Sequence, residues 1–513
     1  MARAVAWERV KMIGRGTRGP RVLRRGRGKV VLLLSCGVVL FSSASSAAAR
    51  FSLTQVSVDP FTNATSQHAT QVEPDSFASG NTVVSAFQSG RFSDGGASDI
   101  GWATSRGGDG RWTTGSLPLT EFAGGPYARA TDPSVAFDAA HHMWLISSLV
   151  LPPTVPSGSE EWWVVVNRSR DRVHWSGPVT VASGPSLNAD KSWTVCDNTR
   201  SSRFFGHCYT EFDDFGNNEK IEMSTSTDGG QTWGAPRTTA AGDYGTGGQP
   251  VVQPNGTVIV PIDDAEEENV LAFRSTDGGA SWSAAVKVSP IRFHVDAGGL
   301  RSAALPSAAI GRAGRVYVAW QDCRFRAGCS SNDIVLSMSD DGLHWSPVDR
   351  VPIDPVSSGA DHFIPGLAVD PLTSGAQTRL ALTYYYYPSA SCTVETCQLD
   401  VGTVRSSDDG AHWTAPVQLA GPMSLSWLPE TGLGYMVGDY ISTSFVNHDP
   451  RPFFALAKPP VGGLFNEAIY TIQGHLEQGG GQLQPAQQDN PTSIWPGSVA
   501  PTDRAPAAPV TRR

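Results

Sequence analysis

Ionisable side chains recur at the start of successive strand-rich segments of this chain. The positions are Glu73, Asp132, Asp190, Lys191, Arg301, His362, Asp439 and Tyr440. Turns collect Asp, Gly and Ser in any case, whereas Lys, Arg, His and Tyr are not typical turn residues. An arginine binds a carboxylate through two parallel hydrogen bonds, and a pair of carboxyl groups can hydrolyse a glycosidic bond. The set is therefore suited to binding an acidic group and to acid–base chemistry.

Loops expected between neighbouring strands add further candidates. They contain Arg91, Glu211 and Arg324, and Arg91 and Arg324 could converge with Arg301 on one carboxylate. The acidic run 263–268 could bind calcium, and a solvated run of charges is the alternative interpretation. No other metal or cofactor is expected, because the sequence has no HExxH, phosphate-binding glycine loop or G-x-S-x-G motif.

A repeated turn motif indicates which elements must position these residues. The pattern S-x-D-x-G-x-x-W occupies 226–233, 275–282 and 406–413, and degraded copies end at Trp112, Trp175 and Trp345. In the last of these, Met338 stands in the Ser place and Asp340 in the Asp place. The Asp can accept backbone N–H groups, the Gly can take a positive φ, and the Trp can bury its ring against a strand. The motif thus predicts a structural hairpin turn and not a catalytic site.

With several such boxes in register, the sequence resembles the Asp-box (BNR-repeat) proteins, the sialidase-like β-propellers, over roughly residues 65–475. The resemblance implies an all-β fold, a propeller of four-stranded blades, with seven blades favoured and six as the alternative. The expected units are 66–120, 128–184, 190–240, 247–290, 300–352, 361–420 and 433–475. Residues Arg50–Val58 are expected to add an outer strand to the last unit.

In the family that this chain resembles, the start of each blade faces one funnel, and a sialidase uses three arginines, a Tyr activated by a Glu, and an acid/base Asp. The counterparts would be Tyr440 or Tyr435 with Glu211 or Glu430, and Asp190 or Asp132 as the acid. The substrate-binding residues would be Glu73, Arg91, Lys191, Arg301, Arg324, His362 and Asp439. The Arg-Ile-Pro signature of sialidases is absent, and Glu73-Pro74 stands in its place. We therefore expect a glycoside hydrolase or polysaccharide lyase on an anionic glycan, with a non-catalytic glycan- or protein-binding propeller as the alternative.

The first 49 residues differ in composition from the remainder and predict a signal peptide. They hold ten of the 39 basic residues and one of the 48 acidic residues, followed by an apolar run and small residues. The remainder carries a formal charge of −18, which disfavours nucleic acid as a partner. The expected organisation is a signal peptide over 1–49, a propeller over 50–475 and a disordered Gln/Pro/Gly-rich tail over 476–513. We expect a secreted monomer with no membrane span after the signal is removed; a retained anchor is the alternative.

Seven cysteines become six when Cys36 leaves with the signal segment. These six form three close pairs in the sequence, Cys196 with Cys208, Cys323 with Cys329, and Cys392 with Cys397. An even number, local pairing and an export signal together predict three disulfides.

Overall fold

The computed structural model describes residues 51–107, 110–153, 161–476 and 482–483. In this part the chain is all-β, as predicted, and helical structure is limited to short 3-10 turns. These turns are η1 (Glu121–Ala123), η2 (Phe215–Asn217), η3 (Ala297–Gly299), η4 (Ala327–Cys329), η5 (Gly375–Gln377) and η6 (Leu425–Trp427). Among the described residues, no helix is long and apolar enough to cross a membrane. The predicted signal segment lies outside the described residues, as does most of the predicted tail.

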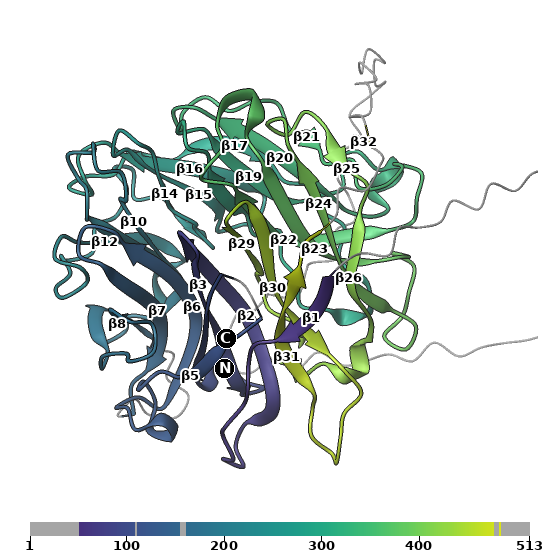
Figure 1. Ribbon diagram of the computed structural model, residues 1–513, viewed down its shortest axis with the longest axis horizontal. Helices are drawn as coiled ribbons and strands as arrows, with labels where there is room; N and C mark the ends of the chain where they lie inside the picture. Colours follow the sequence, from purple (N-terminus) through teal and green to yellow (C-terminus); the bar gives the residue numbers. More distant parts are fainter. Residues whose placement is uncertain (1–50, 108–109, 154–160, 477–481, 484–513) are drawn as a thin grey trace, which may run out of the picture. The chain divides into compact units, whose positions relative to one another are not determined.

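The two ends of the described chain meet in one hydrogen-bonded sheet. Its last strands in the sequence are β29 (Ser442–Val446), β30 (Asp449–Ala457) and β31 (Glu467–Gly474). The first strand, β1 (Phe51–Gln55), pairs antiparallel with β31, so the N-terminal segment adds an outer strand to the last unit, as predicted. Figure 1 shows β1 and β2 at the purple end of the colour scale beside β30 and β31 at the yellow end.

The same sheet continues through the first two predicted units. The first contains β2 (Gln67–Ser79), β3 (Thr82–Arg91), β4 (Ala97–Arg106) and β5 (Thr113–Ser116), and the second β6 (Arg129–Asp138), β7 (Met143–Leu151), β8 (Trp163–Ser169) and β9 (Val179–Ala182). Twelve strands are joined in this way. Each junction between units is a single residue pair, Thr70 with Glu467 and Ala97 with Ala130, whereas strands within a unit pair over several residues.

The following four units form separate sheets. They contain β10 (Ala189–Cys196), β11 (Cys208–Asp214) and β12 (Lys220–Ser226); then β13 (Gly245–Thr246), β14 (Val251–Val252), β15 (Val258–Asp264), β16 (Asn269–Ser275) and β17 (Val286–Pro290); then β18 (Ser307–Ile310), β19 (Val316–Asp322), β20 (Asp333–Ser339) and β21 (Asp349–Arg350); then β22 (Asp361–Val369), β23 (Leu380–Tyr387), β24 (Gln398–Ser406) and β26 (Val417–Ser424). Two short pairs remain, β25 (Trp413–Thr414) with β32 (Gln482–Leu483) and β27 (Glu430–Thr431) with β28 (Gly434–Tyr435). The strand groups follow the predicted units to within a few residues.

Strands near the start of each unit contact the corresponding strand of the next unit. These contacts run from β2 to β6, β10, β14, β18, β22 and β29, and β29 also contacts β2. A recurring hydrogen bond between a polar side chain and the main chain links several of these strands: Val135 N to Asp75, Thr194 N to Ser134, Ala308 N to Gln249, Leu367 N to Ser307, and Ser76 N to Ser442. Successive units are therefore joined through the same position of the repeat.

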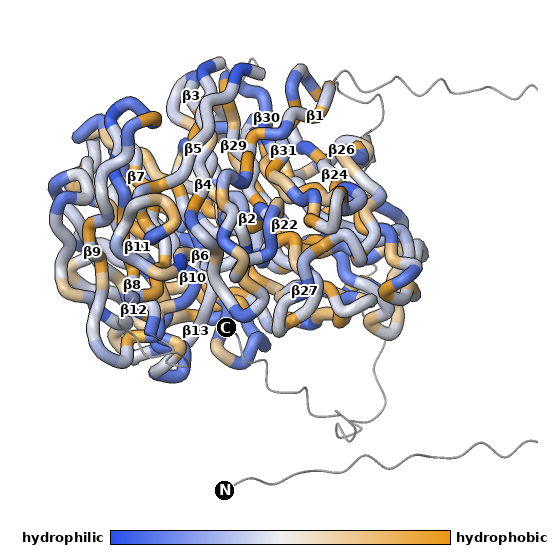
Figure 2. The backbone as a smooth tube through the Cα atoms, turned by 90° about the horizontal axis from the view of Figure 1, so that it is seen from below, coloured by the Kyte–Doolittle hydropathy of each residue, from blue (hydrophilic) through white to orange (hydrophobic). Residues whose placement is uncertain are grey.

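Apolar side chains fill the space between neighbouring sheets. Tyr209, Phe273 and Trp282, for example, come from two successive units and pack in one buried cluster. Figure 2 shows hydrophobic positions along the strands and hydrophilic positions at many of the connecting loops. The buried clusters between sheets therefore form the core of the described chain.

The Asp-box turns have the predicted structural role. In the box 226–233, Asp228 Oδ1 accepts from the backbone N–H groups of Gln231 and Thr232, both at 2.9 Å. The box that ends at Trp345 corrects the sequence alignment by one residue, because Ser339 and Asp341 take the Ser and Asp roles that were assigned to Met338 and Asp340. This turn is one residue shorter between its Asp and its Trp, so the acceptor moves one position along the chain.

All three predicted cysteine pairs are disulfide-bonded. They are Cys196–Cys208, Cys323–Cys329 and Cys392–Cys397. The first joins the far ends of β10 and β11, and the other two close short loops after β19 and β23.

Candidate functional site

Three of the predicted site residues occupy the same strained position in successive units. Glu73, Asp132 and Lys191 have φ values of 54°, 47° and 47°, and at each the pairing of β2, β6 or β10 with its neighbour shifts register. A non-glycine residue in this conformation costs of order 1–3 kcal/mol and persists where the surrounding structure holds it. The bulge bends each strand and re-aims one side chain. The repeat thus brings two carboxyl groups and one ammonium group close together.

These side chains form a buried ion network with Asp439 and Arg301. Lys191 Nζ lies 2.5 Å from Asp439 Oδ2, 3.1 Å from Asp132 Oδ2 and 3.7 Å from Glu73 Oε1. Arg301 binds the same Asp439 carboxylate with both arms, Nε donating to Oδ1 at 2.7 Å and Nη2 donating to Oδ2. We call these five residues the buried ion network. It joins residues that are far apart in the sequence.

The charges in the network set the pKa values of its members in opposite directions. Burial and the neighbouring Asp132 raise the pKa of Glu73 to about 7. Burial alone would raise the pKa of Asp439. The charges of Arg301 and Lys191 outweigh this effect and hold the pKa of Asp439 well below its usual range. Lys191 is also buried, but Asp132 and Asp439 raise its pKa, so it stays charged. The network therefore holds two fixed cations and one carboxyl that can exchange a proton near neutral pH.

Arg91 lies beside the network and is held by three contacts. Its Nη1 donates to Gln88 Oε1 at 3.1 Å and to Gly96 O at 2.9 Å, and its Nε lies 3.1 Å from Met436 Sδ. Gln88 in turn donates to Glu73 Oε2. Burial and the nearby Arg301 lower the pKa of Arg91. Two guanidinium groups are therefore held near each other by different partners.

Both guanidinium residues line a cavity of about 880 Å³, together with Glu430 and Tyr435. We call it the arginine cavity. Glu430 and Tyr435 face each other as a cross-strand pair of β27 and β28, and Arg301 N donates to Tyr435 O at 2.7 Å. The remaining lining residues are Gln67, Ser93, Asp94, Gly95, Ser426, Leu428, Thr431, Gly432, Leu433 and Phe465. The arrangement offers two hydrogen-bonding cations, a phenol and a carboxylate to one bound molecule.

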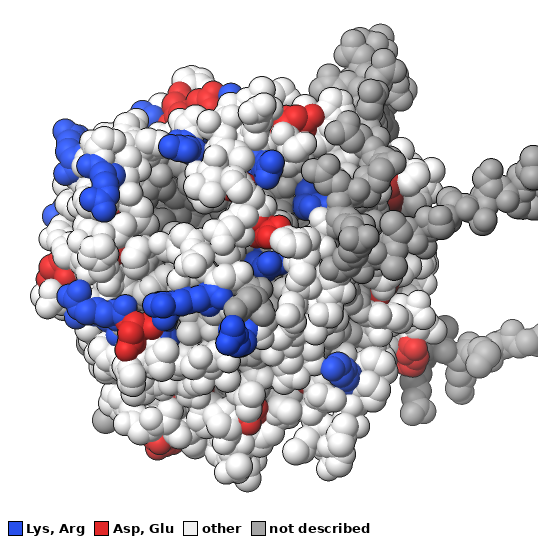
Figure 3. Space-filling view, viewed as in Figure 1, with Lys and Arg blue, Asp and Glu red and all other residues white. Residues whose placement is uncertain are grey.

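The buried ion network is an interior feature. Glu73 is fully buried and Lys191 is 5% exposed. On the face shown in Figure 3, acidic and basic side chains lie in small groups separated by uncharged surface. Arg91, although only 2% exposed, and Arg301 line the arginine cavity, whereas Glu73, Asp132 and Lys191 do not. A ligand there would contact the two arginines.

Three predicted catalytic residues lie beside the network but outside the arginine cavity. The Tyr440 hydroxyl donates to Pro133 O at 3.1 Å, and burial and Glu73 raise its pKa well above the usual range. Glu211 is fully buried against Gly248, and burial and Asp213 raise its pKa. Asp190 accepts from Lys191 N at 2.9 Å. These positions suit support of the network better than contact with a ligand.

Two predicted binding residues lie in other hydrogen-bonded groups. Arg324 donates to Asp322 Oδ1 at 2.9 Å and Oδ2 at 2.7 Å, and to Ser289 Oγ at 3.0 Å, within its own loop region. His362 is buried near Asp333 and Asp354, and burial lowers its pKa. Both of these carboxylates already bind Arg326. Neither Arg324 nor His362 lines the arginine cavity.

Sequence reasoning gave no role to Gln88 or Met436, which hold Arg91 in place. A signal for the bulges was present, because Glu73, Asp132 and Ile364 each precede a proline and each has a positive φ. No spacing rule relates Gln88 to Glu73, since their contact depends on a cross-strand shift.

Residues 158–366 match the family described as BNR repeat-like domain. Over these residues the chain matches the repeat that its Asp boxes predicted, which confirms the resemblance to BNR-repeat proteins. No curated protein matches the sequence.

Among solved structures, similar chains include a Dyadobacter fermentans protein of unknown function (14% identity, 67% of this chain and 94% of that one, TM-score 0.41). The NanB sialidase from Streptococcus pneumoniae is 13% identical, covering 82% of this chain and 70% of that one, with a TM-score of 0.40. An ulvan lyase is 10% identical, covering 79% and 94%, with a TM-score of 0.47. Likenesses this distant assign no activity to this chain.

Proposed function

We propose that the described chain is a seven-bladed β-propeller. Support comes from the seven strand groups, from their single-pair junctions, and from the contacts that link the first strands of successive units and return from β29 to β2. The pairing of β1 with β31 would close the last blade with strands from both ends of the chain. In such a fold the bulges of β2, β6 and β10 point to one axis, which accounts for the buried ion network.

We further propose that the propeller binds an acidic carbohydrate in the arginine cavity and cleaves it by hydrolysis or elimination. The observation that carries this proposal is the presence of Arg91, Arg301, Tyr435 and Glu430 in the wall of one cavity. Guanidinium groups bind carboxylate or sulfate oxygens in pairs, and they remain charged over the working range of pH. The acidic group of the sugar would therefore be anchored at Arg91 and Arg301.

In this proposal, Tyr435 and Glu430 carry the chemistry. A phenol paired with a carboxylate can act as nucleophile or as base, depending on the bond that lies next to it. Phe465 and Leu428 would contact the apolar face of the sugar ring. Asp439 and Lys191 act as positioning residues, because Asp439 holds Arg301, Lys191 holds Asp439, and neither lines the cavity.

The cellular setting in this proposal is extracellular. It rests on the basic and apolar segment at 1–49, which predicts export, and on three disulfides, which persist in oxidising compartments. The signal segment, the propeller over 50–475 and the tail from 476 remain the proposed organisation, with the protein acting as a monomer on a glycan.

Turnover by purified protein tests the proposal. Sialosides, uronic-acid polysaccharides and neutral glycans would be incubated with the wild type, and new reducing ends and unsaturated products would be measured. We expect cleavage of an acidic glycan that is lost in Tyr435→Phe and retained in Tyr440→Phe, since only Tyr435 lines the arginine cavity.

Two outcomes would revise this assignment. Turnover that survives Tyr435→Phe would exclude this residue from the chemistry. Binding of acidic glycans without turnover by the wild type would establish the alternative, a non-catalytic binding propeller.

A further inference from the structure

A second buried carboxyl pair lies outside the buried ion network. Asp296 belongs to the loop 291–302 between β17 and β18, and Asp361 begins β22. Asp296 is 6% exposed and Asp361 is fully buried, and their carboxyl groups lie within hydrogen-bonding reach of each other. Neither residue lines the arginine cavity.

The groups that hydrogen-bond to this pair are uncharged amide and hydroxyl groups. Asn332 N donates to Asp361 Oδ1 at 2.6 Å, and Asn332 Nδ2 donates to Asp296 Oδ1 at 3.1 Å. The Ser302 hydroxyl donates to Asp296 Oδ2. Within the described residues, the second oxygen of Asp361, Oδ2, is buried and receives no hydrogen bond. His294 Nε2 lies 3.9 Å from this oxygen, beyond hydrogen-bonding distance.

Two buried carboxylates in contact need a positive charge between them, because burial penalises each charge and the charges repel each other. In the buried ion network Lys191 and Arg301 supply that charge. Among the described residues, no Lys or Arg pairs with Asp296 or Asp361, and burial and Asp361 raise the pKa of Asp296 well above its usual range. The compensating positive charge is therefore the imidazolium of His294, a proton shared by the pair, or a bound cation.

We propose that a calcium ion binds between Asp296 and Asp361. Calcium takes six to eight oxygen ligands from carboxylates, carbonyls and water, and it tolerates irregular geometry. Asp296, Asp361 Oδ2 and the Ser302 hydroxyl supply oxygens of this kind. A softer metal would favour nitrogen or sulfur ligands, and the imidazole of His294, near the pair, is 29% exposed.

A calcium ion at this pair would also affect the arginine cavity. The same loop that carries Asp296 ends at Ser302, directly after Arg301. Tyr387 also holds this loop, since its hydroxyl donates to Ala297 O at 3.3 Å. Calcium would tie the loop to β22 and so fix the backbone from which Arg301 reaches Asp439. The proposal itself does not depend on which ligand the cavity takes.

Thermal unfolding of the full-length protein at pH 7.5 tests the site. We expect calcium chloride at about 1 mM, compared with EDTA, to raise the midpoint by a few degrees, because a ligand that binds the folded state stabilises it. An affinity in the range of about 0.1–1 mM would be typical of an extracellular calcium site. Magnesium at the same concentration should give a smaller rise, since it demands stricter geometry.

Matched variants locate the response. Asp361→Asn and Asp296→Asn should abolish the calcium-dependent rise, whereas Glu266→Gln should keep it. Glu266 is exposed in the acidic run 263–268 that the sequence offered for calcium, and Asp264 in that run instead accepts from Glu268 N at 2.7 Å and caps its own turn. A response lost in Glu266→Gln, or kept in both Asp variants, would overturn the proposal.

Hydrogen–deuterium exchange of the wild type gives a measurement that needs no variant. Calcium should slow amide exchange in residues 291–302 and around Asn332, with little change in the Asp-box turns. If the wild type shows neither a thermal shift nor slower exchange in this loop, a shared proton or His294 compensates the pair and the calcium site is refuted.

Discussion

Aspartates of the buried ion network and aspartates of the Asp boxes are the same residue type in opposite surroundings. Asp439 is buried and takes its charge partners from Lys191 and Arg301, which come from distant units. Asp228 is half-exposed and takes hydrogen bonds from its own turn; burial works against these bonds, but those from Thr232 lower its pKa. The difference teaches that local turn bonds fix a strand connection, whereas long-range ion pairs fix the relative positions of whole units.

Removal of the central cation should have the largest effect. Lys191→Met leaves Glu73, Asp132 and Asp439 without their shared partner, and removal of one member of a buried ion pair typically costs about 3–5 kcal/mol. Urea unfolding would measure the loss. Lys220→Met is the matched control, because Lys220 lies 3.7 Å from Glu222 in a more exposed pair and should cost about 0–1 kcal/mol. Equal losses in the two variants would remove the distinction between the regions.

A buried carboxyl without a cation should give the next largest effect, as a dependence on pH. Burial raises the pKa of Asp75 to about 7, above its unfolded value of 3.8. Its stabilising contribution is therefore present below about pH 4 and is lost as the pH rises through 7. Asp75→Asn should gain about 2–4 kcal/mol relative to the wild type between pH 4 and pH 8. A constant difference between the two proteins across this range of pH would contradict the account.

An Asp-box substitution should cost less and stay local. Asp228→Ala removes the acceptor of two backbone N–H groups and of the Thr232 hydroxyl, and we expect a loss of about 1–2 kcal/mol. Hydrogen exchange should increase in the turn 226–233 alone. Faster exchange around Lys191 in this variant would show that the boxes and the network are coupled.

The smallest effect is expected at an exposed box. Hydrogen bonds from His344 hold the pKa of Asp341 well below its usual range, so this contribution is present above pH 3.8 and is lost as the pH falls through the folded-state pKa. Because the Asp341 side chain is 43% exposed, solvent screening should limit the cost of Asp341→Asn to about 0.5 kcal/mol at pH 6. Denaturant unfolding at pH 6 and pH 2.5 would measure this cost. A loss above about 2 kcal/mol, which would approach that of a buried ion pair, would be inconsistent with solvent screening.

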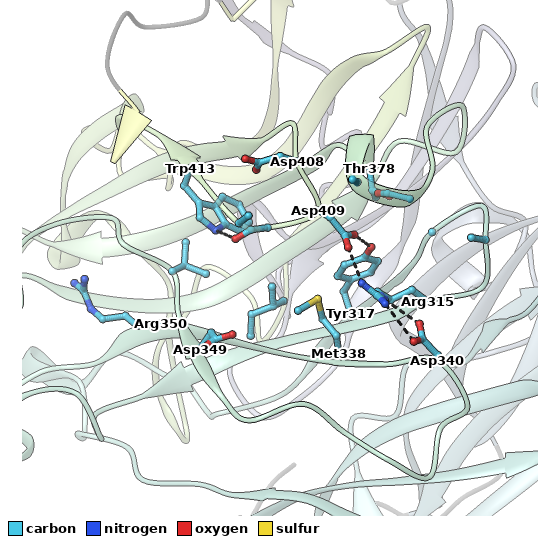
Figure 4. Close-up of a pocket in the computed structure, with 18 of the residues that line it drawn as sticks. Arg315, Tyr317, Met338, Asp340, Asp349, Arg350, Thr378, Asp408, Asp409 and Trp413 are labelled. Carbon is cyan, nitrogen blue, oxygen red and sulfur yellow. Dashed lines mark hydrogen bonds and ion pairs between the residues drawn. The ribbon is translucent and has the colours of Figure 1, made fainter. Parts of the chain in front are cut away.

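Residues of two Asp-box turns line a cavity of about 720 Å³, shown in Figure 4, where turn aspartates and an ion pair lie together. Arg315 bridges Asp340 at 2.8 Å and Asp409 at 2.6 Å, and Tyr317 donates to Asp409. Asp340 was assigned to a box turn by the sequence, but in the structure its side chain pairs with Arg315 of the same unit, and Arg315 in turn bridges to Asp409 of the next unit. Its role depends on a partner 25 residues away, which the box pattern does not encode.

Periodic features were predictable from the sequence, and non-periodic contacts were not. The boxes located the strand groups, and the starts of the units brought Glu73, Asp132 and Lys191 together, because the same bulge recurs in β2, β6 and β10. The sequence grouped Arg324 with Arg91 and Arg301, but in the structure Arg324 hydrogen-bonds to Asp322, two residues away. Choice between such competing partners depends on side-chain direction and burial, which spacing alone does not give.

Binding of acidic oligosaccharides is the most direct test of the arginine cavity. The wild type, Arg91→Gln and Arg324→Gln would be compared on an array of sialylated, uronic-acid, sulfated and neutral glycans, with unfolding midpoints recorded for each. We predict binding of an acidic class that falls at least about 10-fold in Arg91→Gln, the loss of one charge-assisted contact, and is unchanged in Arg324→Gln. Unchanged binding in a folded Arg91→Gln, or equal loss in both variants, would contradict the assignment of this cavity.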